Sequence, residues 1–317
     1  MRYSIIIPVY NRPHEIDELL LSLTEQSYKS FEVIIVEDGS DSKCDHLVKQ
    51  YQDVLDIRYY YKENSGQGFS RNYGFKRAQG DYFVVFDSDC IIPPHYFEAV
   101  NKVLETSDID CWGGPDRAES SFTVTQKAIN FSMTSFLTTG GIRGQKKSLD
   151  SFLPRSFNMG ISKEVFENSG GYKITRMGED LEFSIRIRNA GFNVILIEDA
   201  FVFHKRRTNL IQFFKQLHFF GRARINISRF HPEEIKFVHC APLFFFLGLI
   251  LIPISFFIFP PLCSALLSIY SIYGLSLFLT ALFKEKNPII GFLAIIAGYI
   301  QLSAYGIGFL YEWARKK

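Results

Sequence analysis

The stretch Tyr82-Phe83-Val84-Val85-Phe86-Asp87-Ser88-Asp89 joins an apolar run to two carboxylates that stand one residue apart. Such a run predicts a buried β-strand, and in open α/β sheets ligands bind at the carboxyl ends of the strands. Asp87 and Asp89 therefore form a candidate site for Mg²⁺ or Mn²⁺, because these ions prefer oxygen ligands and often bind through one or two carboxylates plus substrate phosphates. Taken alone, the pair fits a solvated turn after a strand equally well.

Strand patterns alternate with helical patterns on the N-terminal side of this stretch. The expected elements are, in chain order, strand 4–10, helix 13–28, strand 31–36, a short helix, strand 57–61 and helix 68–78. Asn11 is expected to cap the first helix, with Pro13 in its first turn. Strands that alternate with helices predict βαβ units and a parallel sheet. The polar residues that end these strands should meet at one rim of the sheet, which is the layout of a nucleotide site.

Five motifs follow one another along the chain: Ile7-Pro8-Val9-Tyr10-Asn11, Val36-Glu37-Asp38-Gly39-Ser40, Gly66-Gln67-Gly68-Phe69-Ser70-Arg71-Asn72-Tyr73-Gly74, Asp87-Ser88-Asp89 and Gly178-Glu179-Asp180-Leu181-Glu182-Phe183. In order and spacing they resemble the motifs of family-2 glycosyltransferases, over about residues 3–230. The resemblance implies an α/β fold of the GT-A type, with a Rossmann-like mixed sheet sandwiched by helices. It also implies a nucleotide-diphospho-sugar donor and inversion at the anomeric carbon.

The resemblance assigns a set of residues to the donor nucleotide: Pro8, Tyr10, Glu37, Asp38, Gly66, Arg71 and Asp87. Asp38 would accept hydrogen bonds from uracil or another base, and Glu37 would lie near the ribose. Arg71 can reach the diphosphate, since a guanidinium binds phosphate through a planar fork of donors. Tyr10 fits a core position as well, and Glu37 a surface position. The family usually has a small residue where Phe69 or Gln67 stands, so this loop departs from its pattern.

The resemblance makes Asp89 the first choice as metal ligand, with Asp87 sharing the ion and His204 as a candidate third ligand. The metal, Mg²⁺ or Mn²⁺, would neutralise the charge that develops on the departing diphosphate. His204 fits equally well as an imidazole at a strand end beside the basic residues 205–207. The five cysteines are scattered without a Cys-x-x-Cys pair, so the sequence indicates neither a zinc site nor a disulfide framework.

Inverting transfer needs a base that takes a proton from the acceptor hydroxyl as it attacks the sugar. The resemblance implies Asp180 in this role, with Glu179 beside it as a second catalytic residue. A helix cap is the alternative for Asp180, because a carboxylate is favoured at the start of a helix. Asn158 and Trp112 are expected on the acceptor side of the site.

Three stretches in the C-terminal part contain no Asp, Glu, Lys or Arg: residues 237–260, 261–283 and 288–311. Each is long enough to cross a bilayer as a helix, and the 47% of hydrophobic residues in the chain agrees with one large domain plus a membrane region. A buried core helix is the alternative for any one stretch. The expected parts are a catalytic domain at 1–208, a basic amphipathic interfacial segment at 209–236 and an all-α transmembrane region of about three helices at 237–317.

The charges beside these stretches predict their orientation. Residues 205–236 carry eight Lys or Arg against two Glu, which favours the cytoplasmic face. Residues 210–229 interleave Phe with Lys and Arg, so they should lie on the membrane surface as an amphipathic helix or pack on the catalytic domain. The first strand begins almost at residue 1, so we expect no signal peptide and a cytoplasmic catalytic domain.

Three full spans conflict with the charge rule at one end of the chain. They place Lys284 and Lys286 inside, but they place the basic residues 315–317 outside. Three spans are the preferred interpretation, and a re-entrant or interfacial segment among the three is the alternative.

The sequence therefore predicts an inverting, metal-dependent glycosyltransferase that moves a single sugar from a nucleotide-diphospho-sugar, a UDP-sugar above all. The acceptor would be a lipid-linked or growing saccharide at the cytoplasmic face of the inner (plasma) membrane, in cell-envelope or exopolysaccharide biosynthesis. Nucleic acid is not an expected partner, because the basic-aromatic segment adjoins the apolar stretches. The alternatives are a catalytically silent sugar-nucleotide-binding membrane protein and a nucleotidyltransferase. The chain lacks the Gln-x-x-Arg-Trp motif of processive synthases.

Overall fold

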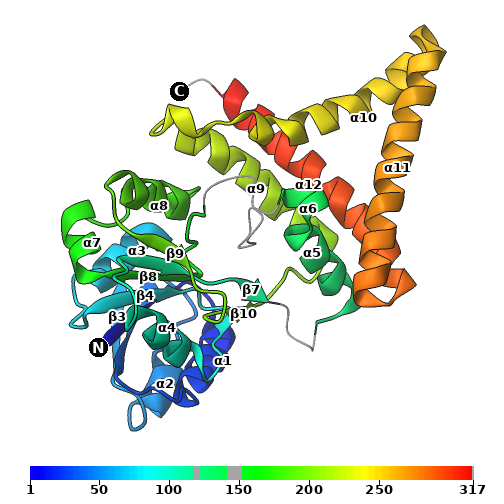
Figure 1. Cartoon of the computed structure of the whole chain (residues 1–317). Helices are drawn as coiled ribbons and strands as arrows, with labels where there is room; N and C mark the ends of the chain where they lie inside the picture. The colour runs from blue at the N-terminus through cyan, green and yellow to red at the C-terminus, as the bar shows by residue number, and fades with distance from the viewer. Residues whose placement is uncertain (118–121, 141–151, 316–317) are drawn as a thin grey trace. The chain divides into compact units, whose positions relative to one another are not determined.

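The computed structural model describes residues 1–117, 122–140 and 152–315 (Figure 1). The chain forms two compact units. The α/β unit comprises Met1–Glu119 with Asp150–Lys205, and the helical unit comprises Ser120–Leu149 with Arg206–Lys317. The boundaries expected from the sequence, after residues 208 and 236, stay a prediction. The structure groups the described residues 122–140 with the helical unit.

A seven-stranded sheet forms the centre of the α/β unit, in the order β3-β2-β1-β4-β8-β6-β9. Its strands are β1 (Tyr3–Val9), β2 (Phe31–Asp38), β3 (Ile57–Lys62), β4 (Tyr82–Phe86), β6 (Cys111–Gly113), β8 (Asn158–Ser162) and β9 (Val194–Leu196). The first four strands are mutually parallel, whereas β8 runs antiparallel to β4 and β6. The expected mixed α/β sheet is therefore confirmed.

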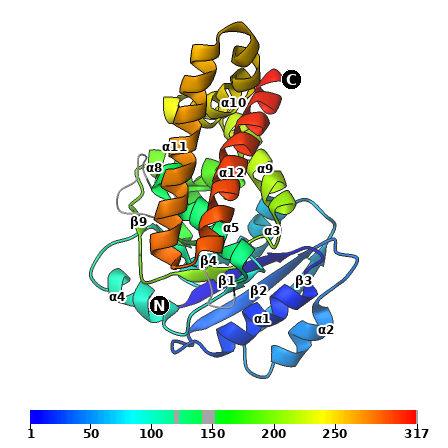
Figure 2. The ribbon, with the colours of Figure 1, turned by 90° about the vertical axis from the view of Figure 1, so that its right-hand side faces the viewer.

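Helices cover both faces of this sheet, because alternate residues of a strand point to opposite sides. Ile5 and Ile7 of β1 join one core with the helices of the first face, and Ile6 joins the other core with the helices of the second face. The first face carries α1 (Pro13–Thr24), α2 (Asp45–Val48) and α4 (Tyr96–Leu104), and the second carries α3 (Gln67–Phe75), α7 (Lys163–Ser169) and α8 (Glu179–Asn189). Figure 2 shows α1 and α2 on the same side of β2 and β3.

A second sheet brings distant residues to the end of β4. It has three short strands in the order β5-β10-β7, which are β5 (Cys90–Ile91), β10 (Val202–His204) and β7 (Asp116–Arg117). In the antiparallel pair of β5 and β10, Cys90 lies opposite His204. This register places His204 beside Asp89, although more than a hundred residues separate the two in the sequence.

The start of α1 differs from the expectation. Asn11 does not cap the helix, because the N-cap position is taken by Arg12, whose side chain makes no capping hydrogen bond. Asn11 has a positive φ of 53°, and its side-chain oxygen accepts hydrogen bonds from the backbone N–H groups of Asp41 and Ser42. Asparagine tolerates this left-handed conformation better than most residues. Asn11 therefore ties the end of β1 to the loop after β2.

The end of α1 also differs, because the helix stops at Thr24 rather than near residue 28. Gln26 is buried just beyond it and donates from Nε2 to the carbonyl oxygens of Ile92 and Pro93. These bonds hold the chain against the segment after β5 and end the helical path. The helix expected at 68–78 is α3, Gln67–Phe75.

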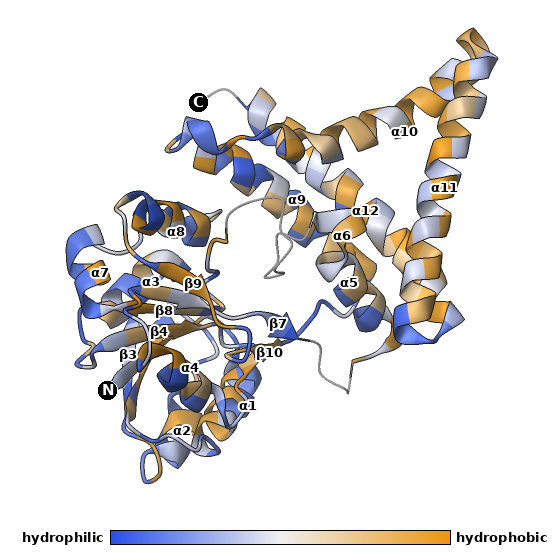
Figure 3. Ribbon diagram, in the orientation of Figure 1, coloured by the Kyte–Doolittle hydropathy of each residue, from blue (hydrophilic) through white to orange (hydrophobic). Residues whose placement is uncertain are grey.

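The helical unit contains long apolar helices as well as helices that carry polar side chains. Its helices are α5 (Val124–Thr134), α6 (Phe136–Thr139), α9 (Leu210–Ser228), α10 (Ala241–Ile258), α11 (Pro260–Glu285) and α12 (Pro288–Ala314), with a 3₁₀ turn at Phe237–Cys240 before α10. Figure 3 shows hydrophobic residues along most of α10, α11 and α12. Three helical segments, Phe237–Ile258, Pro260–Glu285 and Pro288–Ala314, are long and apolar enough to cross a membrane, which confirms the expected number of such segments among the described residues.

Helices α9 and α12 approach each other so closely that glycine is required at the contact. A Cβ atom at Gly221 of α9 would overlap the backbone carbonyl of Tyr305, and one at Gly308 of α12 would overlap the carbonyl of His218. Small residues permit such backbone contact between helices. The side chains around the contact include Phe213, Leu217, Ala297 and Ala304, which form a common core.

We expect Gly308→Ala to lower the thermal stability of the detergent-purified protein, because the added methyl group forces α9 and α12 apart. Overpacking of this kind costs about 1–3 kcal/mol. Gly274→Ala is the matched control, since a Cβ there lies 3.5 Å from the Ile295 side chain, an ordinary contact distance. Equal melting midpoints for the two variants, measured by intrinsic fluorescence, would contradict the close packing of α9 on α12.

Candidate active site

Asp38 ends β2 and organises the loop that leads into α3. Its carboxylate is almost completely buried, forms an ion pair with Lys62 and accepts backbone N–H groups of Ser65 (2.8 Å) and Gly66 (2.9 Å). Burial opposes ionisation, but the Lys62 ammonium and the Ser65 N–H together hold the pKa of Asp38 below its ordinary value. Asp38 is thus a permanent carboxylate at the rim of the sheet.

Glu37 is fully buried, so its surroundings differ from the expected ribose contact. Its carboxylate accepts hydrogen bonds from the Ser40 hydroxyl, from the backbone N–H of Cys44 (2.9 Å) and from the Tyr59 hydroxyl (3.2 Å). This one side chain thus holds three groups, two from the segment after β2 and one from β3. We therefore assign Glu37 to the support of the rim and do not carry it into the proposed donor contacts.

Three other donor-site candidates from the sequence lie at the same rim. Pro8 and Tyr10 flank the last residue of β1, and the Tyr10 side chain is half exposed, so it is accessible to a ligand. Gly66 is the N-cap of α3 with a φ of 90°, and a Cβ there would overlap the Thr175 side chain. Only glycine fits this conformation and this space.

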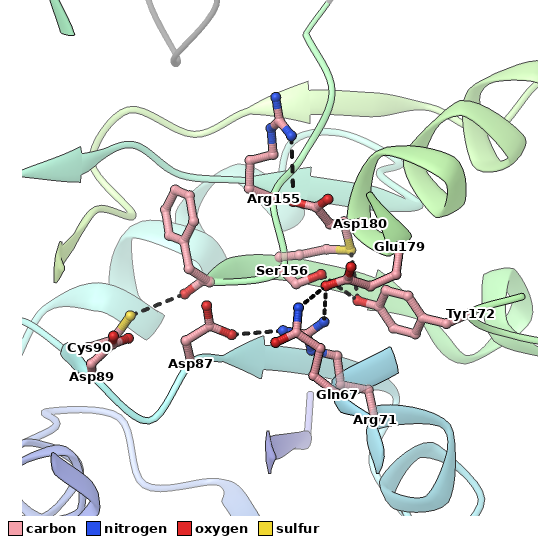
Figure 4. A network of polar contacts seen from close by, with 12 residues as sticks. Gln67, Arg71, Asp87, Asp89, Cys90, Arg155, Ser156, Tyr172, Glu179 and Asp180 are labelled. Carbon is pink, nitrogen blue, oxygen red and sulfur yellow. Dashed lines mark hydrogen bonds and ion pairs between the residues drawn. The ribbon is translucent and has the colours of Figure 1, made fainter. Parts of the chain in front are cut away.

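The buried Arg71 connects α3 with α8 and with the residue after β4 through two ion pairs (Figure 4). One guanidinium nitrogen lies 2.8 Å from Asp87 Oδ1 and another lies 3.2 Å from Glu179 Oε1, while the residue is only 1% exposed. Gln67 also donates to Glu179. Burial and the neighbouring Asp180 raise the pKa of Glu179, and the Arg71 charge opposes this rise. Arg71 thereby brings the Asp-x-Asp and Glu-Asp motifs into one network.

Asp180 differs from Glu179 in its access to solvent. It stands in the first turn of α8, accepts the backbone N–H of Leu181 (2.8 Å), and keeps 23% of its side chain exposed. Arg155 Nη1 lies 3.5 Å from Asp180 Oδ2. Arg155 could not be expected here from the sequence, because no motif contains it and the contact arises only when the segment before β8 passes α8.

Asp89 lies between two basic side chains. Its Oδ2 is 2.7 Å from Arg12 Nη1, and its Oδ1 is 3.1 Å from Nε2 of His204, whose ring stacks on Phe157. Burial opposes ionisation, but His204 and Arg12 hold the pKa of Asp89 below its ordinary value. Arg12 was not expected here; it reaches Asp89 because it follows directly on Asn11 at the end of β1.

The oxygen of Asp89 and the imidazole nitrogen of His204 fit a divalent cation. Both are metal-ligand atoms, and their separation of 3.1 Å is what two ligands of one ion require. Cys90 lies within the same group, but burial raises the pKa of its thiol well above the ordinary value, so it stays protonated. Asp87, which was expected to share the ion, forms an ion pair with Arg71. Asp89 and His204 are therefore the pair that could hold Mg²⁺ or Mn²⁺.

Two residues expected on the acceptor side lie in the core. Trp112 is 0% exposed, and its ring packs against Gly160, where a Cβ would overlap the indole. Asn158 is also 0% exposed; its Oδ1 accepts from the Tyr96 hydroxyl (2.6 Å) and its Nδ2 donates to the Ala200 carbonyl (2.7 Å). Neither side chain has a surface that an acceptor can touch, so we leave both out of the proposed acceptor site.

Asp38→Asn should lower the melting midpoint at pH 7 by roughly 6–12 °C, because it removes one partner of a buried ion pair. Since the folded-state pKa of Asp38 lies below the ordinary 3.8, its stabilisation is present above that pH and is lost as the pH falls through the folded-state value. The gap between wild type and variant should therefore narrow in acid. Asp41→Asn, an exposed change in the same loop, is the control, and equal midpoints at pH 7 would refute the assignment.

Arg71→Met should destabilise the protein more than the double change Arg71→Met with Glu179→Gln. The single variant leaves the buried Glu179 carboxylate without its counter-charge, whereas the double variant removes both charges together. Melting midpoints of the two variants at pH 7 test this order. A double variant that is less stable than the single one would show that Arg71 does not serve as the counter-charge of Glu179.

Comparison with known proteins gives the chain its family. A family model described as Glycosyl transferase family 2 matches residues 4–170. An uncharacterised glycosyltransferase of Haemophilus influenzae is 29% identical over 219 residues, which cover 65% of this chain and 70% of that protein. One of Rickettsia conorii is 41% identical over 117 residues, 35% of this chain and 19% of that protein. The chain thus spans about a fifth of the length of the Rickettsia conorii relative.

Solved structures agree in fold. The mannosyltransferase PcManGT from Pyrobaculum calidifontis, in complex with GDP-Man and Mn²⁺, matches with a TM-score of 0.64 and 18% identity, over 98% of this chain and 87% of that one. TarS from S. aureus in complex with UDP-GlcNAc matches with a TM-score of 0.50 and 19% identity, over 71% and 67%. These likenesses support the GT-A fold. Because the family model matches more than half of its residues, the chain belongs to glycosyl transferase family 2.

Proposed function

We propose that this glycosyltransferase moves a single sugar from a UDP-sugar to a lipid-linked or growing saccharide, with inversion at the anomeric carbon. The observation that carries the proposal is the Arg71 bridge, which holds Asp87 of the Asp-x-Asp motif and Glu179 of the Glu-Asp motif in one network. The residues expected to bind the donor and the residue expected to activate the acceptor therefore stand next to each other.

Asp180 is the base in this proposal. An acceptor hydroxyl must reach the base, and Asp180 keeps part of its side chain exposed whereas Glu179 is buried and is held by Arg71 and Gln67. The Asp180 carboxylate, beside Arg155, is the group that would take the proton from the acceptor hydroxyl. Glu179 acts as a positioning residue, since it fixes the first turn of α8 through Arg71.

The donor would bind along the rim formed by β1, β2 and β4. The half-exposed Tyr10 would contact the nucleoside, Asp38 would act through the loop that it holds before α3, and Asp87 after β4 would accept hydrogen bonds from ribose or sugar hydroxyls. Relatives of the same fold bind GDP-Man and UDP-GlcNAc, so the choice of UDP rests on the resemblance alone. A donor panel decides it.

Asp89 and His204 would hold Mg²⁺ or Mn²⁺. The bound ion supplies charge neutralisation for the departing diphosphate. Arg12 adds a second positive group at the same carboxylate, 2.7 Å from Asp89 Oδ2. In this arrangement Arg12 keeps Asp89 ionised and oriented, because it takes Oδ2 and leaves Oδ1 to the ion.

The apolar helices favour an acceptor that is itself in the membrane. A catalytic unit attached to such helices works on a surface where a lipid-linked saccharide is concentrated. We place that surface at the cytoplasmic side of the cell membrane, because the segment between the α/β unit and α10 is rich in Lys and Arg. A role in cell-envelope or exopolysaccharide assembly follows from such an acceptor.

The proposal is tested by measuring the release of nucleoside diphosphate. The protein is given a panel of UDP-, GDP- and TDP-sugars in the presence of Mn²⁺, Mg²⁺ or EDTA. We expect one donor to be turned over only with metal, and we expect Asp89→Ala and Asp180→Asn each to lower the rate at least about 100-fold. Asp53→Asn, an exposed carboxylate outside the site, is the matched control and should keep the wild-type rate.

Binding of the nucleotide separates the roles of the two aspartates. Asp180→Asn should bind the nucleoside diphosphate as wild type does, whereas Asp89→Ala should lose the metal-dependent part of that binding. If the Asp180→Asn variant kept the full turnover rate, Asp180 would not be the base. Release of pyrophosphate in place of nucleoside diphosphate would identify a nucleotidyltransferase.

A further inference from the structure

The three apolar segments differ in how far the protein covers them. Within the most apolar window of each, 6% of residues are buried in Phe237–Ile258, 17% in Pro260–Glu285 and 44% in Pro288–Ala314. The first two are therefore mostly free to contact lipid, and the third, which contains α12, is packed against other parts of the helical unit. The helices that pack on α12 decide whether it can cross the membrane.

Helices α5 and α6 cover the first half of α12. The Ser132 hydroxyl donates to Oε1 of Gln301 (2.9 Å), whose Nε2 donates to the Thr138 carbonyl (3.4 Å), and Phe131 packs with Ala294. The chain leaves the α/β unit after β7 and returns to it before β8, and α5 and α6 are too short to cross a bilayer. Both helices therefore stay on the membrane face that carries the α/β unit.

Helix α9 covers the second half of α12. The two run side by side at the Gly221–Tyr305 and His218–Gly308 contacts, and Glu312 near the end of α12 pairs with Arg222 (2.9 Å) and Arg229 (3.0 Å). Other polar side chains of α9 include Gln212, Lys215 and Arg224. A helix with these charges does not lie in hydrocarbon. If α12 crossed the bilayer, α9 would have to cross beside it.

The junction of α10 and α11 has the opposite character, because it suits a lipid environment. Only Phe259 separates the two helices, and its N–H bonds to the Ser255 carbonyl. Pro260 and Pro261 have no N–H, and the N–H groups of Leu262 and Cys263 both bond to the Phe259 carbonyl. No backbone N–H from residue 259 to 263 needs water, so this junction can enter a bilayer where an ordinary loop cannot.

We propose that α10 and α11 alone enter the bilayer, as one hairpin, while α12 lies along the membrane surface together with α5 and α9. Both ends of the helical unit then stand on the face that carries the α/β unit. The exposed side chains at the start of α12, Ile289, Phe292 and Ile296, recur at helical spacing and form the stripe that faces lipid. Tyr311 and Trp313 near its end are residues that favour the membrane interface.

This arrangement removes the conflict in the charge rule. A hairpin places Lys284 and Lys286 on the same face as the α/β unit, and a surface-bound α12 keeps the basic residues 315–317 there as well. Three crossing helices would separate these two groups of charges. The proposal concerns membrane placement alone, so it holds or fails independently of the donor and the metal.

Protease accessibility in sealed vesicles tests the proposal with the full chain. One epitope tag is placed before Met1 and another after Lys317, and the vesicles are treated with protease with and without permeabilising detergent. We expect the two tags to be cut together in vesicles of either orientation. Cleavage of only one tag in intact vesicles, and of both after detergent, would show that α12 crosses and would overturn the proposal.

Depth measurements with spin labels provide the second test, since they report on α12 itself. Single labels at Ile289, Phe292 and Ile296 of α12 are compared with labels at Ile272 and Leu275, exposed positions in the middle of α11. We expect one shallow depth along α12 and a deep position in α11. A depth that increases continuously along the α12 series until it equals that of the α11 labels would mean that α12 spans the bilayer.

Discussion

The buried guanidinium of Arg71 is the interaction on which the candidate site depends. It is fixed by α3, and it holds the carboxylates that end β4 and begin α8 at 2.8 and 3.2 Å. Removing a charge from water costs much free energy, and only close partners on both sides offset that cost. Asp87 and Glu179 are such partners. Without Arg71, the two carboxylates that face it would repel each other, and the first turn of α8 would lose its anchor to the sheet.

Burial gives different roles to acidic residues that look alike in the sequence. Glu37 and Asp38 are neighbours at the end of β2, and both are used within the protein to hold loops in place. Glu179 and Asp180 are neighbours too, yet only Asp180 keeps a face toward solvent. A motif names the position of a carboxylate but not its hydrogen-bond partners. Reactivity follows from those partners, because they decide which carboxylate a substrate can reach.

The alternating strands and helices could be predicted because apolar runs such as residues 82–86 and 31–36 carry a local signal. The contacts of Arg12 with Asp89 and of Arg155 with Asp180 could not, since each joins segments that only the sheet brings together. Trp112 was misplaced for the same reason. The sequence around an aromatic residue does not distinguish a residue that lines a cleft from one that fills a core. For Trp112, the contact of its ring with Gly160 shows that it fills the core.

In the helical unit, hydropathy likewise does not tell which side chains surround a helix. Helix α12 is rich in Gly and Ala, which are small residues without a polar side chain, and its glycines let α9, α10 and α11 approach its backbone. A window that counts only side-chain polarity cannot separate a helix surrounded by lipid from one covered by amphipathic neighbours. Gln301 and Glu312 mark the difference, since each is buried in α12 and each finds its partner on a helix that cannot enter the bilayer. The partners of its few polar residues, rather than its mean hydropathy, place α12 at the surface.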